Sequence, residues 1–170
     1  GGGGGGRTGG GGGRGGYGGR LGGRGRGEAR VRERGGMRAA LAEIDGDTRA
    51  GLERAAERSE RFAKAQRGAI RDVTIDIDGG QAGHTVEPVT AAGCYAPGGR
   101  YPLPSSVLMT AITARAAGCE RVVVASPGAH PVMLAAASIA GADAYLCAGG
   151  AHGIAALAFG FDGFAPCDVI

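Results

Sequence analysis

Residues 121–160 read RVVVASPGAHPVMLAAASIAGADAYLCAGGAHGIAALAFG, and this stretch decides the fold class. It begins with a β-branched run in residues 121–125, which predicts a buried strand. A proline then opens and a glycine closes an apolar segment over 131–140, the pattern of a helix. A second apolar strand is predicted at 144–148 and a second helix at 152–159. Strand and helix therefore alternate through this stretch.

The same alternation extends on both sides of that stretch. Upstream, residues 93–96 predict a short strand and residues 105–117 an apolar helix that ends at Gly118. Downstream, residues 168–170 begin another strand. The strands are continuously apolar, which is typical of parallel strands that are buried on both faces. We therefore expect an α/β fold in which helices cover both faces of a parallel sheet.

Before this region the sequence predicts one amphipathic helix over residues 47–66, with Asp47 as its N-cap. Small and apolar residues follow the three-and-four spacing of one helical face, namely Leu52, Ala55, Ala56, Ser59, Phe62 and Ala63. Charged residues fill the rest of the helix, with favourable pairs four residues apart such as Glu60 and Lys64. The charged side is therefore interpreted as a solvated face.

Between the helix and the alternating region, the hydrophobic period changes to two. Val73, Ile75 and Ile77 alternate with polar residues, which predicts a strand. Two glycines at 79–80 then break the chain, and residues 85–90 are expected to form the partner strand. On this interpretation the connection is longer than that of a tight hairpin.

Residues 1–36 form a segment of a different kind. They contain 21 of the 38 glycines and eight arginines against two acidic residues. Glycine at this density makes backbone order too costly for burial to offset, so we expect disorder. Steps such as Arg14-Gly15-Gly16, with Tyr17 nearby, resemble the Arg/Gly segments that contact RNA. RNA binding through this leader is kept as an alternative function, and a passive low-complexity segment is the favoured interpretation.

Several classes of protein are excluded by the remaining composition. The chain has no run of about 18 apolar residues and no charged region followed by an apolar stretch, so neither a membrane span nor a secretory signal is expected. The four cysteines are widely separated and are interpreted as reduced thiols. We expect a soluble cytoplasmic protein. The arginine-rich, acid-poor leader leaves plastid targeting as an alternative.

Two glycine loops are candidates for ligand binding, at residues 97–106 and 149–153. Each follows a predicted strand and leads into a helix, and in open parallel sheets ligands bind at such loops. Neither loop fits GxGxxG or a P-loop. From spacing alone, a nucleotide or phosphate site and an ordinary strand-to-helix turn are equally good interpretations.

No catalytic or metal-ligating constellation is visible in the sequence. The three histidines are far apart, and the acidic residues show no pairing that would mark a general acid and base. His84 and His130 lie beside glycine or proline and are expected in exposed loops. His152 is expected to begin a helix at the end of a buried strand, where a binding role and a structural role are equally open. We predict no catalytic residue and no metal ligand in this chain.

Three segments of the chain resemble the histidinol dehydrogenase family. Residues 93–109, GCYAPGGRYPLPSSVLM, are similar to the family signature GxYxPGGxxxxPSxVLM. Residues 114–127 are similar to its xAGxxxVVxxSPP segment, and residues 148–160 to its GGAQAIAALAFGT element. The three motifs occur in the family order with matching spacing. The preceding helix, residues 60–66 included, fits the family as well, whereas residues 1–36 carry none of the resemblance.

The resemblance implies a Rossmann-like, NAD-dependent, zinc-containing enzyme that oxidises L-histidinol to L-histidine through the aldehyde and acts as a homodimer. By position, Tyr95 falls on the motif tyrosine that contacts NAD, and His152 falls on the motif glutamine that does the same. Histidine offers one donor and one acceptor where the amide offers two of each, so this contact is either kept or rearranged. The family's third NAD contact, an asparagine, falls beyond Ile170.

The family's zinc ligands, acid and base also come later in its sequence. The 170 residues are therefore expected to be an N-terminal fragment, with residues 1–36 as the leader, 37–92 as a helix and strand region and 93–170 as an incomplete NAD-binding region. We expect the fragment itself to be inactive and poorly soluble. A paralogue that oxidises another alcohol, such as sulfopropanediol, is the alternative within the family.

Overall fold

The computed structural model describes residues 30–98, 101–161 and 163–170. The predicted disorder and RNA contacts of residues 1–29 lie outside these residues. The strands are β1 (Arg30–Glu33), β2 (Val73–Ile77), β3 (Gly80–His84), β4 (Ala91–Tyr95), β5 (Arg121–Ser126) and β6 (Ala144–Cys147). The helices are α1 (Arg34–Ala39), the short 3-10 helix η1 (Ala40–Ala42), α2 (Gly46–Ala69), α3 (Pro104–Ala117), α4 (Pro131–Ile139) and α5 (Gly150–Phe159).

Four strands form the main sheet, in the order β1-β6-β5-β4. The last three are parallel, as predicted, while β1 adds to β6 in the antiparallel sense. On the other side of β4, Val169 bridges Ala92 in parallel, so residues 168–170 begin a further strand there. The chain thus builds outward from β4 in one direction and then returns to its other side. This is the strand order of a doubly wound sheet, and it confirms the predicted α/β class.

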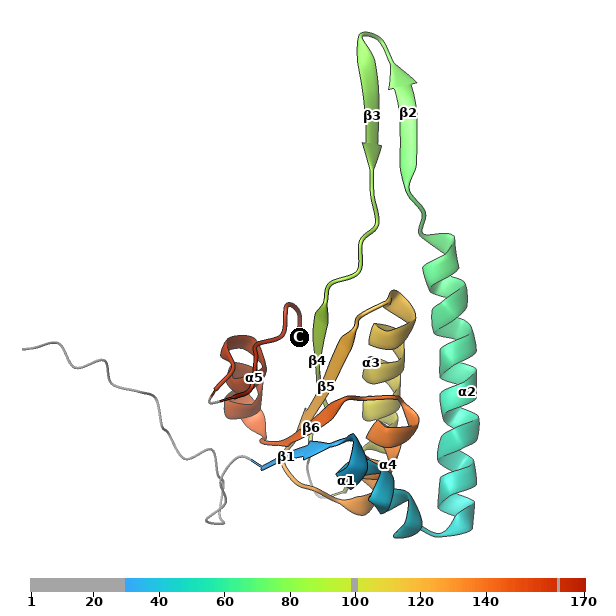
Figure 1. The fold of residues 1–170 in the computed structure, drawn as a ribbon. Helices are drawn as coiled ribbons and strands as arrows, with labels where there is room; N and C mark the ends of the chain where they lie inside the picture. Colours follow the sequence, from blue (N-terminus) through green and yellow to red (C-terminus); the bar gives the residue numbers. More distant parts are fainter. Residues whose placement is uncertain (1–29, 99–100, 162) are drawn as a thin grey trace, which may run out of the picture.

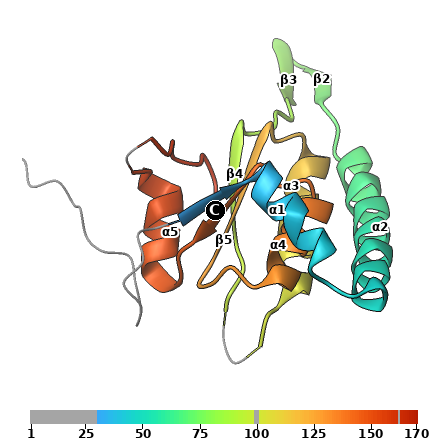
Figure 2. The same cartoon turned by 60° about the horizontal axis from the view of Figure 1, so that its bottom comes forward.

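Helices cover both faces of this sheet (Figure 1, Figure 2). Helices α3 and α4 pack on one face, with α2 outside α3 and α1 beside α4, and α5 packs on the opposite face. Alternate strand residues explain the two layers, since Val122 and Val124 of β5 belong to the core under α3 and α4, whereas Val123 and Ala125 face α5. All four are fully buried. Continuous apolar strands were therefore a correct sign of two-sided burial.

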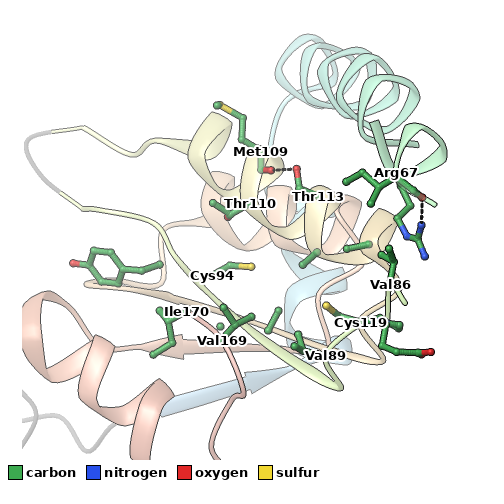
Figure 3. A pocket seen from close by; sticks show the side chains of 18 of the residues that line it. Arg67, Val86, Val89, Cys94, Met109, Thr110, Thr113, Cys119, Val169 and Ile170 are labelled. Atoms are coloured by element: carbon green, nitrogen blue, oxygen red, sulfur yellow. Dashed lines mark hydrogen bonds between the residues drawn. The ribbon is translucent and has the colours of Figure 1, made fainter. Parts of the chain in front are cut away.

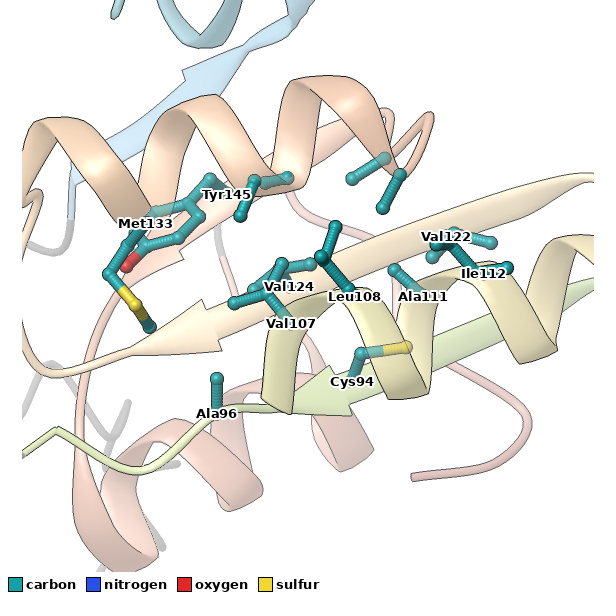
Figure 4. Close-up of a cluster of buried hydrophobic side chains, with 14 of the residues drawn as sticks. Cys94, Ala96, Val107, Leu108, Ala111, Ile112, Val122, Val124, Met133 and Tyr145 are labelled. Carbon is teal, nitrogen blue, oxygen red and sulfur yellow. The ribbon is translucent and has the colours of Figure 1, made fainter. Parts of the chain in front are cut away.

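The core under α3 and α4 is filled by small and medium-sized side chains (Figure 4). Val107 and Leu108 of α3 point toward the sheet, and Met133 of α4 lies next to Tyr145 of β6. On the other face, Leu157 of α5 is fully buried above Gly93, where an added Cβ would lie 3.1 Å from the leucine Cδ1. Glycine at this position therefore allows α5 to pack closely on β4, and a Cβ there would require Leu157 to shift by a few tenths of an ångström.

Helix α2 is longer than predicted and begins earlier. Its N-cap is Asp45, whose carboxylate accepts hydrogen bonds from the Thr48 backbone N–H at 2.8 Å and the Thr48 hydroxyl at 2.6 Å. The prediction of Asp47 as the N-cap is wrong, because that residue already lies in the first turn. Leu52, Ala56 and Ala63 are buried as predicted, but Phe62 is 66% exposed. The predicted ion pair between Glu60 and Lys64 is present.

Strands β2 and β3 form a tight hairpin that extends away from the sheet (Figure 1). Ile77 pairs with Gly80, so only Asp78 and Gly79 make the turn. Gly79 has a φ of 87°, which favours glycine in such a two-residue connection. The predicted partner strand at 85–90 is therefore wrong. The Asp-Gly step was the local signal for the tighter turn.

The structure also corrects the predicted limit of the disordered leader. Residues 30–36 lie in β1 and the start of α1, and Met37 is fully buried. Arg34 forms an ion pair with Asp143, which ties the start of α1 to the loop before β6. These residues lack hydrophobic periodicity, and pairing with an existing sheet edge gives them their structure.

No helix among the described residues is long and apolar enough to cross a membrane.

Candidate functional site

The loops after β4, β5 and β6 meet at the carboxyl edge of the parallel strands. Pro127, directly after β5, lies between Gly98 of the first loop and Gly149 of the third. A Cβ on Gly98 would lie 2.8 Å from the proline Cδ, and a Cβ on Gly149 would lie 2.5 Å from its Cγ. Both glycines are therefore needed for loop packing, which is the structural side of the two interpretations left open by the sequence.

Tyr95 ends β4 and reaches across to the third loop. The side chain is half-buried, and its hydroxyl oxygen accepts a hydrogen bond of 2.8 Å from the backbone N–H of Gly150. A Cβ on Gly153 would meet the Ala148 carbonyl oxygen at 2.5 Å and the Tyr95 ring at 3.4 Å. The tyrosine thus packs against the first turn of α5 and caps one of its free amides.

His152 is exposed in that same turn. Helix α5 starts at Gly150, two residues before the predicted position, so His152 lies within the helix rather than at its beginning. Because the Tyr95 hydroxyl contacts Gly150, the fold brings both predicted site residues to one helix end. The other two histidines lie elsewhere in the fold.

His84 and His130 have structural roles. His84 is exposed as predicted, but it lies in β3 rather than in a loop, and its Nε2 is 3.1 Å from the Arg71 carbonyl oxygen. His130 is the N-cap of α4, where its Nδ1 accepts a hydrogen bond of 3.3 Å from the Val132 N–H. Sequence reasoning missed this cap, although the following Pro131 marked the helix start.

Tyr145 of β6 forms a hydrogen bond to the loop after β5. The side chain is fully buried in β6, and its hydroxyl donates a hydrogen bond of 2.7 Å to the Gly128 carbonyl oxygen. Burial raises the pKa of Tyr145 to about 12, so its hydroxyl stays protonated and keeps donating at neutral pH. Nothing in the sequence distinguished Tyr145 from an ordinary core aromatic residue.

A hollow of about 750 Å³ runs along β4, beside Val169 and Ile170 (Figure 3). It extends from Tyr95 past α3 to residues 86–89 and is lined mainly by apolar side chains. Burial raises the pKa of Cys94 to about 11, so this thiol is protonated at neutral pH and is a poor nucleophile. Arg67, at the rim, donates to the Ile70 carbonyl oxygen and closes α2. The hollow therefore offers an apolar surface without convergent polar groups.

Within the part of the chain that the structure describes, no three His, Cys, Asp or Glu residues lie together so as to hold a metal ion. The polar groups at the carboxyl edge suit a different ligand. In the first turn of α5, the N–H groups of Ala151 and His152 have no partner within the helix, and Gly150 has a φ of 59° with open space around it. Free amides at a helix N-terminus and a tyrosine hydroxyl favour an anionic group such as a phosphate.

The chain was compared with known protein families and structures. The family model described as histidinol dehydrogenase matches residues 24–170. The match thus begins within residues 1–36, so the expectation that this whole segment carries none of the resemblance is wrong.

Curated relatives include the histidinol dehydrogenase of Methanopyrus kandleri, 46% identical over 69% of this chain and 28% of the relative. The histidinol dehydrogenase homolog 1 of Mesorhizobium japonicum is 39% identical over 81% of this chain and 30% of the relative. The sulfopropanediol 3-dehydrogenase of Ruegeria pomeroyi is 36% identical over 79% of this chain and 32% of the relative. The chain thus spans 28–32% of the length of these relatives.

A crystal structure of histidinol dehydrogenase from Elizabethkingia anophelis superposes with a TM-score of 0.69 at 28% sequence identity. The superposition covers 78% of this chain and 32% of that structure. Sequence motifs, strand order and the match to most of the chain agree with one another. The chain belongs to the histidinol dehydrogenase family, and its fold is the fold of that family.

Proposed function

We propose that the complete protein containing this chain oxidises L-histidinol to L-histidine with NAD, and that residues 93–170 supply part of the NAD-binding region. The observation that carries the proposal is the Tyr95 hydroxyl at the N-terminus of α5, 2.8 Å from the Gly150 nitrogen. This hydroxyl lies at the end of β4, where the strand order reverses, and doubly wound sheets bind dinucleotides at that point.

In this proposal Tyr95 and His152 contact NAD. The Tyr95 hydroxyl accepts from Gly150, and its own hydrogen is available for an oxygen of the dinucleotide. His152 is exposed on the first turn of α5, and in this proposal its ring nitrogens contact the same dinucleotide. The bound NAD supplies a hydride acceptor. The chain's own residues bind and orient it, and the amides of α5 offset its negative charge.

The described residues hold no cluster of side chains that could bind zinc. We propose that zinc ligands, the acid and the base come from the rest of the complete protein, and that the protein is a homodimer. On this proposal the 170-residue chain alone is inactive. The relatives come from bacteria and archaea, so we propose a cytoplasmic location. These relatives do not support the alternative of plastid targeting.

The first experiment is to determine the gene sequence on both sides of this chain and to purify the complete product. We expect NAD reduction at 340 nm with L-histidinol, loss of that activity with a zinc chelator, and its return when zinc is added. The 170-residue chain is assayed in parallel and is expected to show no turnover. Turnover by this chain, or a complete product that binds no NAD, would contradict the proposal.

The second candidate is oxidation of sulfopropanediol. It is supported by the relative of that name, which covers nearly as much of the chain as the histidinol dehydrogenase homolog from Mesorhizobium japonicum. Both substrates are compared with the same enzyme preparation by kcat/KM, since this ratio measures discrimination. A higher kcat/KM for sulfopropanediol would assign the chain to that branch of the family.

A further inference from the structure

Pro127 fills the space between two glycines that are far apart in the sequence. Its Cδ and Cγ would both lie 2.8 Å from a Cβ on Gly98, and its Cγ and Cβ would lie 2.5 and 2.7 Å from a Cβ on Gly149. Real Cβ atoms essentially never approach a heavy atom this closely. The proline ring is thus in direct contact with the loop after β4 and with the loop after β6.

The ring itself is held in place from the core. Pro127 follows Ser126, which is 2% exposed, and precedes Gly128, whose carbonyl oxygen accepts the hydrogen bond from Tyr145 at 2.7 Å. The Tyr145 side chain is fully buried between the sheet and α4 (Figure 4). The residue before Pro127 is therefore held in β5, and the residue after it is hydrogen-bonded to β6, so the position of the proline ring is fixed relative to both strands.

The two loops that abut Pro127 are also those that carry the proposed NAD contacts. The first loop continues from Tyr95, and the second leads into the turn of α5 that holds His152. Among the residues that the structure describes, a single hydrogen bond joins the two loops directly, from the Gly150 N–H to the Tyr95 hydroxyl at 2.8 Å. A change in loop separation would alter that bond and the distance between the two contacts.

We propose that Pro127 is a positioning residue for dinucleotide binding: it sets the separation of the loops that carry Tyr95 and His152 without touching the ligand. This inference rests on the proposed NAD site. It assigns Gly98 and Gly149 the role of making room for the proline rather than for the dinucleotide.

The test is a double-mutant cycle in the complete protein, read as the dissociation constant of NAD by calorimetry. Gly98→Ala is expected to weaken NAD binding at least about tenfold, because the new methyl forces the first loop away from Pro127. Pro127→Ala removes the two ring atoms nearest to that methyl. The double variant Gly98→Ala with Pro127→Ala is therefore expected to bind NAD more tightly than Gly98→Ala alone.

Gly68→Ala is the matched control, since no atom lies within 4 Å of a Cβ at Gly68, its φ is not in the left-handed region, and the residue lies in α2, outside both loops. It is expected to bind NAD like the wild type. In steady-state kinetics Gly98→Ala should raise the KM for NAD more than it lowers kcat, because a saturating dinucleotide restores the loop geometry. General destabilisation would not produce this split or the rescue.

Tyr145→Phe provides a second variant if Gly98→Ala does not fold. It keeps the buried ring and removes the hydroxyl, with its bond to Gly128 and its interaction with Ser126, and NAD binding is expected to weaken about threefold. Wild-type protein that fails to bind NAD would overturn the proposed function. Wild-type protein that binds, with Tyr145→Phe unchanged and Gly98→Ala either unchanged or not rescued by Pro127→Ala, would overturn the role of Pro127 alone.

Discussion

Tyr95 and His152 differ in how firmly the fold holds them. Tyr95 is half-buried, packs near Gly153 and accepts a hydrogen bond from Gly150, so its position is set before any ligand binds. His152 is exposed, and its position depends only on the helix that carries it. A substitution at Tyr95 should therefore change both the loop structure and the proposed binding of NAD, whereas a substitution at His152 should change NAD binding alone.

The first prediction concerns these two residues in the complete protein. Tyr95→Phe should weaken NAD binding about three- to tenfold, because it removes the hydroxyl bond and leaves the Gly150 N–H without that acceptor. His152→Gln should bind NAD at least as tightly as the wild type, since an amide has more donors and acceptors. His152→Ala should bind more weakly. Calorimetric dissociation constants give the comparison, and a His152→Gln variant weaker than His152→Ala would contradict the proposed contact.

Asp143 links three parts of the fold at the opposite edge of the sheet. Its carboxylate forms ion pairs with Arg34 and Arg115 and accepts a hydrogen bond of 2.7 Å from the Val122 N–H. Burial by itself raises the pKa of Asp143, but the Val122 N–H and the two arginines outweigh burial, so the pKa lies below its usual value. The ionised form is therefore the one that stabilises the fold.

The second prediction follows from the lowered pKa of Asp143. A carboxyl whose folded-state pKa is lowered stabilises the fold above its unfolded pKa of about 4, and this contribution is lost as the pH falls through the folded value. Asp143→Asn should lower the free energy of unfolding by about 1–3 kcal/mol at pH 7. The difference from the wild type should shrink below pH 4. Thermal unfolding across this range measures it, with Glu57→Gln on the exposed side of α2 as control. A difference that stays constant with pH would be the contrary result.

At the scale of elements, the N-cap of α2 differs between the sequence-based prediction and the structure. Two aspartates lie two residues apart, and either satisfies the preference of an N-cap for a short acidic side chain. The structure selects Asp45, because its backbone is extended and its carboxylate reaches Thr48. These bonds hold the pKa of Asp45 below its ordinary value, the Thr48 side chain contributing most.

The third prediction is that Asp45→Ala lowers the thermal stability of the chain more than Asp47→Ala. The first change removes a cap, whereas the second removes only a favourable charge in the first turn. The midpoints of unfolding, followed by helical circular dichroism, provide the comparison. A larger loss for Asp47→Ala would restore the N-cap predicted from the sequence.

At the scale of the whole molecule, several large apolar side chains are exposed among the described residues. All ten strand residues of the β2–β3 hairpin are exposed, and Val73, Ile75 and Ile77 are each at least 44% exposed. Met109, Val169 and Ile170 add to this surface beside the hollow along β4. Exposed β-branched strands favour self-association.

The fourth prediction is that the isolated 170-residue chain self-associates and that Ile75→Lys reduces this tendency. The control is Thr74→Lys, which adds the same charge on the other face of the hairpin. Light scattering against protein concentration measures the effect. Equal reduction by both variants would show that charge alone, and not the apolar face, controls association.

Particular elements explain which predictions succeeded. The strands and helices from β4 to α5 were recognised because their signals are local: β-branched runs, a proline at the start of a helix and a glycine at its end. Strand β1 was missed, because its structure depends on pairing with β6 rather than on its own pattern. The partner strand of the hairpin was predicted at residues 85–90, whereas the Asp78-Gly79 turn makes the chain reverse immediately and pairs β2 with residues 80–84.

The sequence by itself determined the parallel α/β class, the family and the residue types at Tyr95 and His152, since repeated local patterns and ordered motifs carry that information. Only the tertiary structure decided that Tyr95 meets the first turn of α5, and that Pro127 separates Gly98 from Gly149. These contacts join residues up to 55 positions apart. The crossover connections of a parallel sheet bring such residues together at one edge, and no local pattern records which side chains then touch.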